Sequence, residues 1–213
     1  MDGNRRWSLK ANTSSFNAYY KGANNLLKIS KYCFEKYPYL KNLSAFALST
    51  NNMKREKRGI SIIKSVITKI LNENNFDRKV NFIIEIKGDT KFLGVKLNNQ
   101  INNLNSNNEN IKKLTIFINY GGQEDIIAAV NKIKNYKNKI DIDHFKKYLI
   151  TSNMPDPDIL IRTGGFKRIS NFNLFQISFT ELFFLKKLWP DFNNNDLDKI
   201  VNKYFKIDRK FGI

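Results

Sequence analysis

The stretch DPDILIRTGGFKRISNF, residues 156–172, is the most informative segment of the chain. Its part DILIR is a short, nearly continuous apolar run, which is the pattern of a strand buried on both faces of a sheet. The strand ends at Arg162 in front of a glycine pair, although an unpaired charge at the end of a buried strand is costly. Arg168 and Ser170 follow within eight positions. Two guanidinium groups and a hydroxyl can therefore converge on one diphosphate.

The same alternation of buried runs and amphipathic stretches continues along the rest of the chain. Strand patterns occur at 43–50, 80–89, 114–122 and 158–162. Helical periodicity occurs at 16–34, 60–71, 91–104, 124–136, 143–150 and 193–206. This alternation predicts an α/β fold with a mostly parallel central sheet flanked by helices. Since no linker rich in Pro, Gly or Ser interrupts the pattern, we predict a single domain over residues 1–213.

The composition favours a globular chain and leaves the meaning of its charge open. Hydrophobic residues make up 41% of the 213 residues, and no apolar run approaches the roughly 20 residues of a membrane span. The formal net charge of +18 is compatible with a nucleic-acid-binding protein, whose duplex binding would weaken steeply with salt. The basic residues are mostly lysines scattered among Asn and Ile, a trio that an AT-rich genome encodes. We therefore predict no nucleic-acid partner.

Cys33 and His144 are the only residues of their types. A single cysteine excludes a disulfide within the chain and a thiolate metal site. No GxSxG motif accompanies His144, so we expect a surface histidine on a helix. Residues 1–30 lack the apolar core of a signal peptide, which predicts a cytoplasmic protein.

Small, amide and cationic residues follow the predicted strands, where parallel sheets place their ligands. They are Ser49, Thr50, Asn51, Asn52 and Arg55; Gly88 and Asp89; Asn119, Gly121 and Gly122; and several residues of 162–171. Such groups bind phosphate oxygens. Asp2 is the natural Mg²⁺ candidate, because Mg²⁺ takes one or two carboxylates together with substrate phosphates. Glu181, in an apolar segment, is the other acid that needs a partner. Walker A, GxGxxG and DDxxD motifs are absent.

Five motifs in a fixed order carry a family resemblance. They are MDGNRRW (1–7), ALSTNNMKR (47–55), INYGGQEDI (118–126), DPDILIRTGGFKRISNF (156–172) and FTELFFLKKLWPDF (179–192). In this order they resemble the motifs of the cis-prenyltransferases, in particular the bacterial undecaprenyl diphosphate synthases. The similarity covers essentially the whole chain. It implies the cis-prenyltransferase fold, with a hydrophobic tunnel, in a homodimer.

The resemblance also implies a reaction. This is the Mg²⁺-dependent cis-condensation of isopentenyl diphosphate onto an allylic diphosphate, usually farnesyl diphosphate, to give a long-chain lipid carrier precursor. The enzyme would be cytoplasmic or peripheral to the membrane that receives the product.

The same resemblance assigns roles to individual residues. Asp2 and Asn52 would be catalytic, and Asp2 and Glu181 would hold Mg²⁺. The allylic diphosphate would be bound by Gly3, Asn4, Arg6, Trp7, Ser49 and Arg55. The isopentenyl diphosphate would be bound by Arg162, Arg168 and Ser170. The opening stretch MDGNRRW is thereby expected to be a catalytic loop.

The chain departs from the family pattern at several positions. They are Arg5, Ser15, Tyr19, Asn51, Met53, Gln123 and Phe166, the last of which stands where the family has an acid. The alternative is therefore a catalytically weakened or non-catalytic partner subunit. In the family a buried strand precedes the DGN sequence, and no such strand precedes Asp2 here. We expect either that the true start lies upstream or that Asp2 is held loosely.

Overall fold

The computed structural model describes residues 1–55, 57–73, 82–104 and 112–209, and its strands form two parallel sheets. The central sheet has the order β1–β3–β2, with β1 at Asn42–Ser49, β2 at Ile83–Lys87 and β3 at Lys113–Tyr120. A second sheet pairs β4 (Ile159–Arg162) with β5 (Glu181–Phe184). Every pairing is parallel, which confirms the predicted α/β class.

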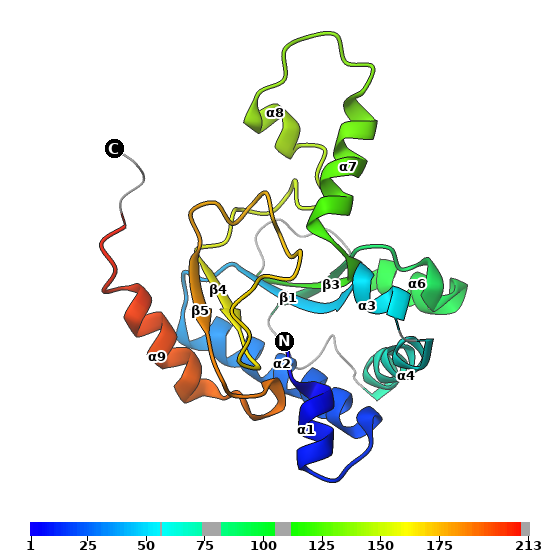
Figure 1. The fold of residues 1–213 in the computed structure, drawn as a ribbon, viewed down its shortest axis with the longest axis vertical. Helices are drawn as coiled ribbons and strands as arrows, with labels where there is room; N and C mark the ends of the chain where they lie inside the picture. Colours follow the sequence, from blue (N-terminus) through cyan, green and yellow to red (C-terminus); the bar gives the residue numbers. More distant parts are fainter. Residues whose placement is uncertain (56, 74–81, 105–111, 210–213) are drawn as a thin grey trace.

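The helices surround these sheets (Figure 1). They are α1 (Asn4–Lys10), α2 (Ser15–Lys36), α3 (Thr50–Arg55), α4 (Lys57–Glu73), α6 (Val95–Leu104), α7 (Gly122–Ile133), α8 (Ile142–Lys146) and α9 (Asn194–Tyr204), with 3₁₀ turns η1 (Lys91–Leu93) and η2 (Trp189–Asp191). In Figure 1, α9 lies beside β5, whereas α7 and α8 project away from the body of the molecule. The predicted strands and helices are found, although residues 80 and 81 lie outside the described part and the helix predicted at 143–150 ends at Lys146. The strand predicted at 158–162 belongs to the second sheet and not to the central one. Three elements, α1, α3 and β5, were not predicted. The expected helix at 91–104 is divided at Gly94, whose φ of 86° breaks the helical path.

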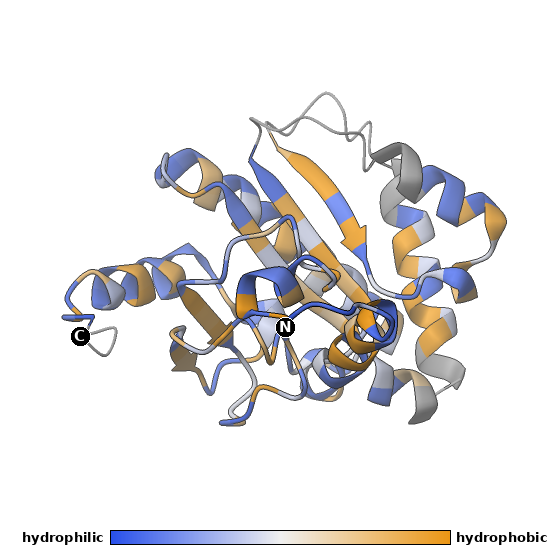
Figure 2. Ribbon diagram, turned by 90° about the horizontal axis from the view of Figure 1, so that it is seen from above, coloured by the Kyte–Doolittle hydropathy of each residue, from blue (hydrophilic) through white to orange (hydrophobic). Residues whose placement is uncertain are grey.

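The core lies between α2 and the central sheet. The Ser14 side chain caps α2 by accepting a hydrogen bond from the Asn17 amide at 3.1 Å. The helix then buries an apolar stripe of Leu26, Ile29, Cys33 and Phe34 against Ala45, Ile84 and Leu114 of the strands. Figure 2 shows long hydrophobic stretches along these strands. Burial of this stripe is the main force that fixes the sheet under the helix. No described helix is long and apolar enough to cross a membrane.

Asp198 joins α9 to α2. Its carboxylate accepts hydrogen bonds from the hydroxyls of Tyr32 at 2.7 Å and Tyr37 at 2.6 Å, and from the Lys36 ammonium at 2.6 Å. Partial burial opposes the charged carboxylate, but these three donors outweigh it and lower the pKa of Asp198 to about 2. The carboxylate is therefore part of what holds α9 in place.

The variant Asp198→Asn is expected to be about 1 kcal/mol less stable at pH 7, because an uncharged acceptor replaces a charged one. The unfolded chain has an Asp pKa of about 3.9. The wild-type carboxylate thus stabilises the fold above about pH 4 and loses this effect as the pH falls toward 2. Urea unfolding between pH 5 and pH 2 should show a smaller loss of stability for the variant. Asp143→Asn, at an exposed position on α8, is the control and should behave as wild type.

Candidate active site

The β4–β5 pair places Arg162 at the end of its strand. The Leu185 amide donates to the Arg162 carbonyl at 2.9 Å, which extends the pairing beyond β5. Thr163 comes next, and the two residues after it, Gly164 and Gly165, have φ values of 88° and 85°, a region that residues with side chains rarely adopt. Their amides donate to the carbonyls of Lys187 and Leu185, both at 2.8 Å. This fixed turn brings the following loop back over the Arg162 side chain.

The Arg162 guanidinium binds three groups. Its Nη1 donates to Ser170 Oγ at 2.7 Å and also to the backbone carbonyl of Arg168. Its Nη2 donates to Asp2 Oδ2 at 2.9 Å. The predicted convergence of Arg162 and Ser170 is therefore present in the structure, and Asp2 joins it from the other end of the chain.

The backbone of Asp2 is held on both sides. The Thr163 hydroxyl accepts from the Asp2 amide at 3.0 Å and donates to the Asp2 carbonyl at 2.9 Å. The Trp189 amide donates to the same carbonyl at 3.0 Å. Thr163 is only 1% exposed. The expectation of a loosely held Asp2 is therefore wrong. Thr163, which the sequence placed among the possible phosphate-binding residues after β4, instead holds the Asp2 backbone.

The segment after Asp2 is a helix and not a loop, which corrects the sequence-based expectation. Gly3, with a φ of 110°, makes a left-handed turn so close to Leu188 that a Cβ would lie 2.8 Å from its Cδ2. Helix α1 then starts at Asn4 and carries Arg6 on its first turn. Arg6 Nη1 donates to the Gly164 carbonyl at 2.7 Å, and Nη2 to Asp2 Oδ1 at 3.2 Å. Each oxygen of Asp2 thus binds one guanidinium.

The variant Gly164→Ala is expected to lower kcat/KM roughly 10²-fold, since small displacements of binding groups can have effects of that size. A Cβ on Gly164 would lie 2.6 Å from Arg6 Nη2 and 3.1 Å from Asp2 Cγ, so both side chains must move. Gly165→Ala is the matched control, because its φ is similar but its Cβ would meet only Lys186 Cα at 3.9 Å. Steady-state kinetics with thermal unfolding should show a shared loss of stability, whereas the large loss of activity should be confined to Gly164→Ala. Equal activity losses in the two variants would contradict this interpretation.

Arg6, Arg162 and Arg168 gather around the Phe166 ring and are called the arginine cluster below. Trp7 and Asn4 contact other parts of the molecule. The Trp7 indole donates to Asp191 Oδ1 at 2.7 Å, and the Lys21 ammonium lies 4.1 Å above its ring. Asn4 Oδ1 is buried without a hydrogen-bond partner among the described residues, and it lies against Gly22 of α2. In this chain Trp7 therefore anchors α1 to η2, whereas Asn4 keeps an unused acceptor.

A second polar group lies at the end of β1. Ser49 Oγ accepts from the Asn52 amide at 3.1 Å, which places both residues at the start of α3. Glu124 accepts from the Thr50 hydroxyl at 2.9 Å and from Asn171 Nδ2 at 2.8 Å. Glu124, which the sequence did not single out, thus ties the end of β1 to the loop that carries Ser170. The Arg55 side chain lies outside the described part of the structure.

Glu181 and Asp2 do not lie side by side in the folded chain. It is the first residue of β5 and pairs with Ile159, three pairs before Arg162. Since strands rise about 3.3 Å per residue, Glu181 lies about 10 Å along the strands from the end at which Arg162 binds Asp2. The predicted metal pair is therefore not brought together in one chain. Among the described residues no group of three or more His, Cys, Asp or Glu could hold a metal ion.

Asp2 alone still suits Mg²⁺, which needs only one or two carboxylates when phosphate oxygens complete its shell. Its side chain is 32% exposed, so its oxygens remain accessible to a ligand and to an ion. The residues present therefore fit a magnesium ion that is shared between Asp2 and a bound diphosphate.

An apolar cavity of about 120 Å³ lies between α2, α4 and the central sheet. Its lining includes Asn4, Tyr19, Leu26, Ile63, Ile116 and Trp189. Asn4, which lines the cavity, belongs to the same short helix as Arg6. An apolar space therefore lies next to the helix that carries part of the cationic cluster.

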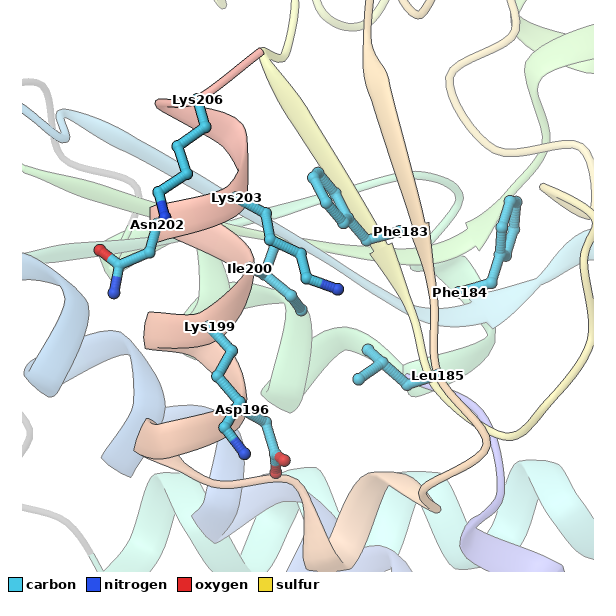
Figure 3. Close-up of a pocket in the computed structure, with 9 residues that line it drawn as sticks. All are labelled: Phe183, Phe184, Leu185, Asp196, Lys199, Ile200, Asn202, Lys203 and Lys206. Atoms are coloured by element: carbon cyan, nitrogen blue, oxygen red, sulfur yellow. The ribbon is translucent and has the colours of Figure 1, made fainter.

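A wider hollow of about 400 Å³ lies between β5 and α9. Figure 3 shows Phe183 and Leu185 pointing toward α9, whereas Phe184 points the other way. Lys199 and Lys203 contribute to its rim. None of the residues of the arginine cluster lines it, so we do not regard it as the reaction site.

Comparison with known proteins identifies the family of the chain. The undecaprenyl diphosphate synthase family model matches residues 1–212. The isoprenyl transferase of Fusobacterium nucleatum is 37% identical over 218 residues, which cover 100% of this chain and 93% of that protein. The (2E,6E)-farnesyl-diphosphate-specific ditrans,polycis-undecaprenyl-diphosphate synthase of Micrococcus luteus is 32% identical over 227 residues, covering 100% and 88%.

A solved structure extends the similarity to the fold. Lavandulyl diphosphate synthase from Lavandula x intermedia, in complex with dimethylallyl diphosphate, superposes with a TM-score of 0.87 at 28% identity. The match covers 100% of this chain and 95% of that one. The chain therefore belongs to the undecaprenyl diphosphate synthase family and is a prenyltransferase.

Proposed function

We propose that this chain condenses isopentenyl diphosphate onto an allylic diphosphate, with farnesyl diphosphate as the primer and with Mg²⁺ as the cofactor. The observation that carries the proposal is the carboxylate of Asp2, held between Arg6 at 3.2 Å and Arg162 at 2.9 Å. Ser170 lies beside Arg162. The apolar cavity is lined in part by Asn4 of α1, the helix that carries Arg6. This combination suits a ligand with a diphosphate head and a hydrocarbon tail. The relative in Micrococcus luteus, which is farnesyl-diphosphate specific, supports the choice of primer.

The reaction breaks the carbon–oxygen bond of the allylic diphosphate and leaves negative charge on the departing diphosphate. Guanidinium groups that are already in place stabilise this charge as it develops. Arg6, with the backbone of Gly3, would hold the allylic diphosphate, whereas Arg162, Arg168 and Ser170 would hold the isopentenyl diphosphate. A magnesium ion held by Asp2 and the diphosphate would supply Lewis-acid stabilisation of the leaving group.

The double-bond electrons of the isopentenyl unit form the new carbon–carbon bond, and that unit would then lose a proton to the released diphosphate. Ser49 is the last residue of β1 and Asn52 lies in the first turn of α3, and Glu124 links the intervening Thr50 to the loop that carries Ser170. We assign them to the positioning of the isopentenyl unit during proton loss. Repetition of the cycle would give the long-chain product, which would then pass to the membrane.

The apolar cavity would receive the prenyl tail as the start of a tunnel. Its walls come from α2, α4 and the strands, so the tail would run between helices and sheet and away from water. Exclusion of water matters because the allylic carbocation would otherwise react with it.

A homodimer is part of the proposal. Several apolar side chains on α7 and α8 are exposed, among them Ile127 at 60%, Val130 at 45% and Ile142 at 66%. These helices project from the body of the molecule in Figure 1, and such a projecting apolar face suits contact with a second copy. Sedimentation velocity of the purified chain tests the assembly.

The reaction itself is tested with purified protein, farnesyl diphosphate, radiolabelled isopentenyl diphosphate and Mg²⁺. Label is expected in a lipid-soluble product, and chromatography of the dephosphorylated product would give its length. A folded, soluble preparation that transfers no label would contradict the proposed reaction and favour a non-catalytic subunit. Replacement of Mg²⁺ by EDTA is the control and should abolish the transfer.

A further inference from the structure

Phe166 lies in the middle of the arginine cluster. It follows the glycine pair after β4, and its side chain is 41% exposed. The guanidinium carbon of Arg168 lies 4.1 Å from the centre of its ring, that of Arg6 lies 4.9 Å away, and that of Arg162 lies 5.7 Å away. One aromatic ring is thus in cation–π range of three guanidinium groups.

The charge of the cluster makes this ring important. Arg6 and Arg162 share the single carboxylate of Asp2. Arg168 forms no ion pair with the described residues, and its guanidinium forms a cation–π contact with the Phe166 ring at 4.1 Å. Three positive groups and one negative group leave a net charge of +2 in a small volume. Such groups repel one another unless something attracts all of them.

The three arginines come from different parts of the fold. Arg6 lies on α1, Arg162 ends β4, and Arg168 lies in the loop beyond the glycine pair. A single exposed aromatic side chain on a surface is ordinary and needs no explanation. The Phe166 ring differs, because it contacts arginines from α1, from the end of β4 and from the following loop. These arginines surround the proposed anion site.

We propose that Phe166 is a positioning residue of the diphosphate site, whose ring holds the three guanidinium groups together without neutralising them. The proposal rests on the proposed function. An acidic side chain at this position would also attract the arginines, but it would remove one unit of the positive charge that an incoming diphosphate needs. The ring attracts through its quadrupole and carries no net charge, so the full charge of the cluster remains for the ligand.

Phe166→Leu and Phe166→Tyr separate the role of the ring from the role of apolar bulk. Leucine keeps the bulk and loses the ring, whereas tyrosine keeps the ring face. We expect Phe166→Leu to weaken binding of inorganic diphosphate about 10-fold and Phe166→Tyr to change it less than about twofold. KM for isopentenyl diphosphate should rise to the same extent in the leucine variant, with kcat at saturation little changed. Isothermal titration calorimetry and steady-state kinetics provide the two measurements.

Phe205→Leu is the matched control. Phe205 is 75% exposed just after α9 and contacts Tyr204, so its loss removes an exposed ring outside the cluster. Its diphosphate affinity should equal that of the wild type.

Three results would overturn the proposal. They are unchanged diphosphate binding in Phe166→Leu, equal weakening in the leucine and tyrosine variants, and no diphosphate binding by the wild type. The proposed reaction can fail separately. A wild type that transfers no label but binds diphosphate more tightly than Phe166→Leu would refute the reaction and leave the role of Phe166 intact.

Discussion

Asp2→Asn is expected to lower kcat/KM roughly 10³-fold, because the change removes the charge both of the proposed ligand for Mg²⁺ and of the shared partner of two arginines. An asparagine keeps the backbone contacts to Thr163 and Trp189, so the fold should be preserved. Its amide nitrogen would face a guanidinium, however, and two donors cannot bind each other. Arg6 and Arg162 would then lose the carboxylate that positions both of them.

Steady-state kinetics at increasing Mg²⁺ concentrations provide the measurement for Asp2→Asn. We expect that high Mg²⁺ restores little of the activity, because the arginines remain misplaced. Asp156→Asn is the control, since it removes a carboxylate from an exposed ion pair with Lys146. That control should keep wild-type kinetics. Near-normal activity of Asp2→Asn, with its fold intact, would show that the carboxylate is dispensable.

Arg162→Lys is expected to lower kcat/KM roughly 10²-fold, with a large part of the loss in KM for isopentenyl diphosphate. The guanidinium reaches Ser170 Oγ, the Arg168 carbonyl and Asp2 Oδ2 through a rigid planar fork. A lysine keeps the charge but offers one ammonium, which cannot span these positions. The side chain is 13% exposed, so water cannot easily replace the lost contacts.

Ser170→Ala tests the same network more gently. It removes one neutral acceptor from Arg162, so we expect about a tenfold effect at most. Kinetics with varied isopentenyl diphosphate should rank the two variants in this order. If Arg162→Lys were as active as Ser170→Ala, the planar fork would not matter. Thermal unfolding of both variants guards against a general loss of structure.

The sequence predicted the fold where local pattern and tertiary structure agree. Residues 158–162 form a short apolar run and do become β4, and the periodic stretch from Phe16 becomes α2. Helix α1 was missed because it has only seven residues and begins with Asn4 and two arginines, a composition that resembles a basic loop. Strand β5 was missed because its four residues lie within a longer apolar run that gives no boundary.

The site was predictable only where its members are neighbours in sequence. Arg162 and Ser170 are eight positions apart around a glycine turn, so their meeting could be inferred from spacing. The bond between Thr163 and the Asp2 backbone joins residues 161 positions apart, and no local signal marks it. The same reason explains why the sequence paired Glu181 with Asp2. Both are acids that need partners, but strand register, which spacing does not show, places Glu181 three pairs before the end at which Arg162 binds Asp2.

The double contact of Asp2 has a consequence for ligand selectivity. With one guanidinium on each oxygen, Asp2 acts as an internal competitor that already occupies the arginines in the free chain. A monovalent anion offers no more charge than the carboxylate it would displace, so the exchange gains little. A diphosphate carries several negative charges and many acceptor oxygens, and it can outcompete the carboxylate on both arginines at once. The charge of the ligand is therefore expected to contribute to selectivity independently of its hydrocarbon tail.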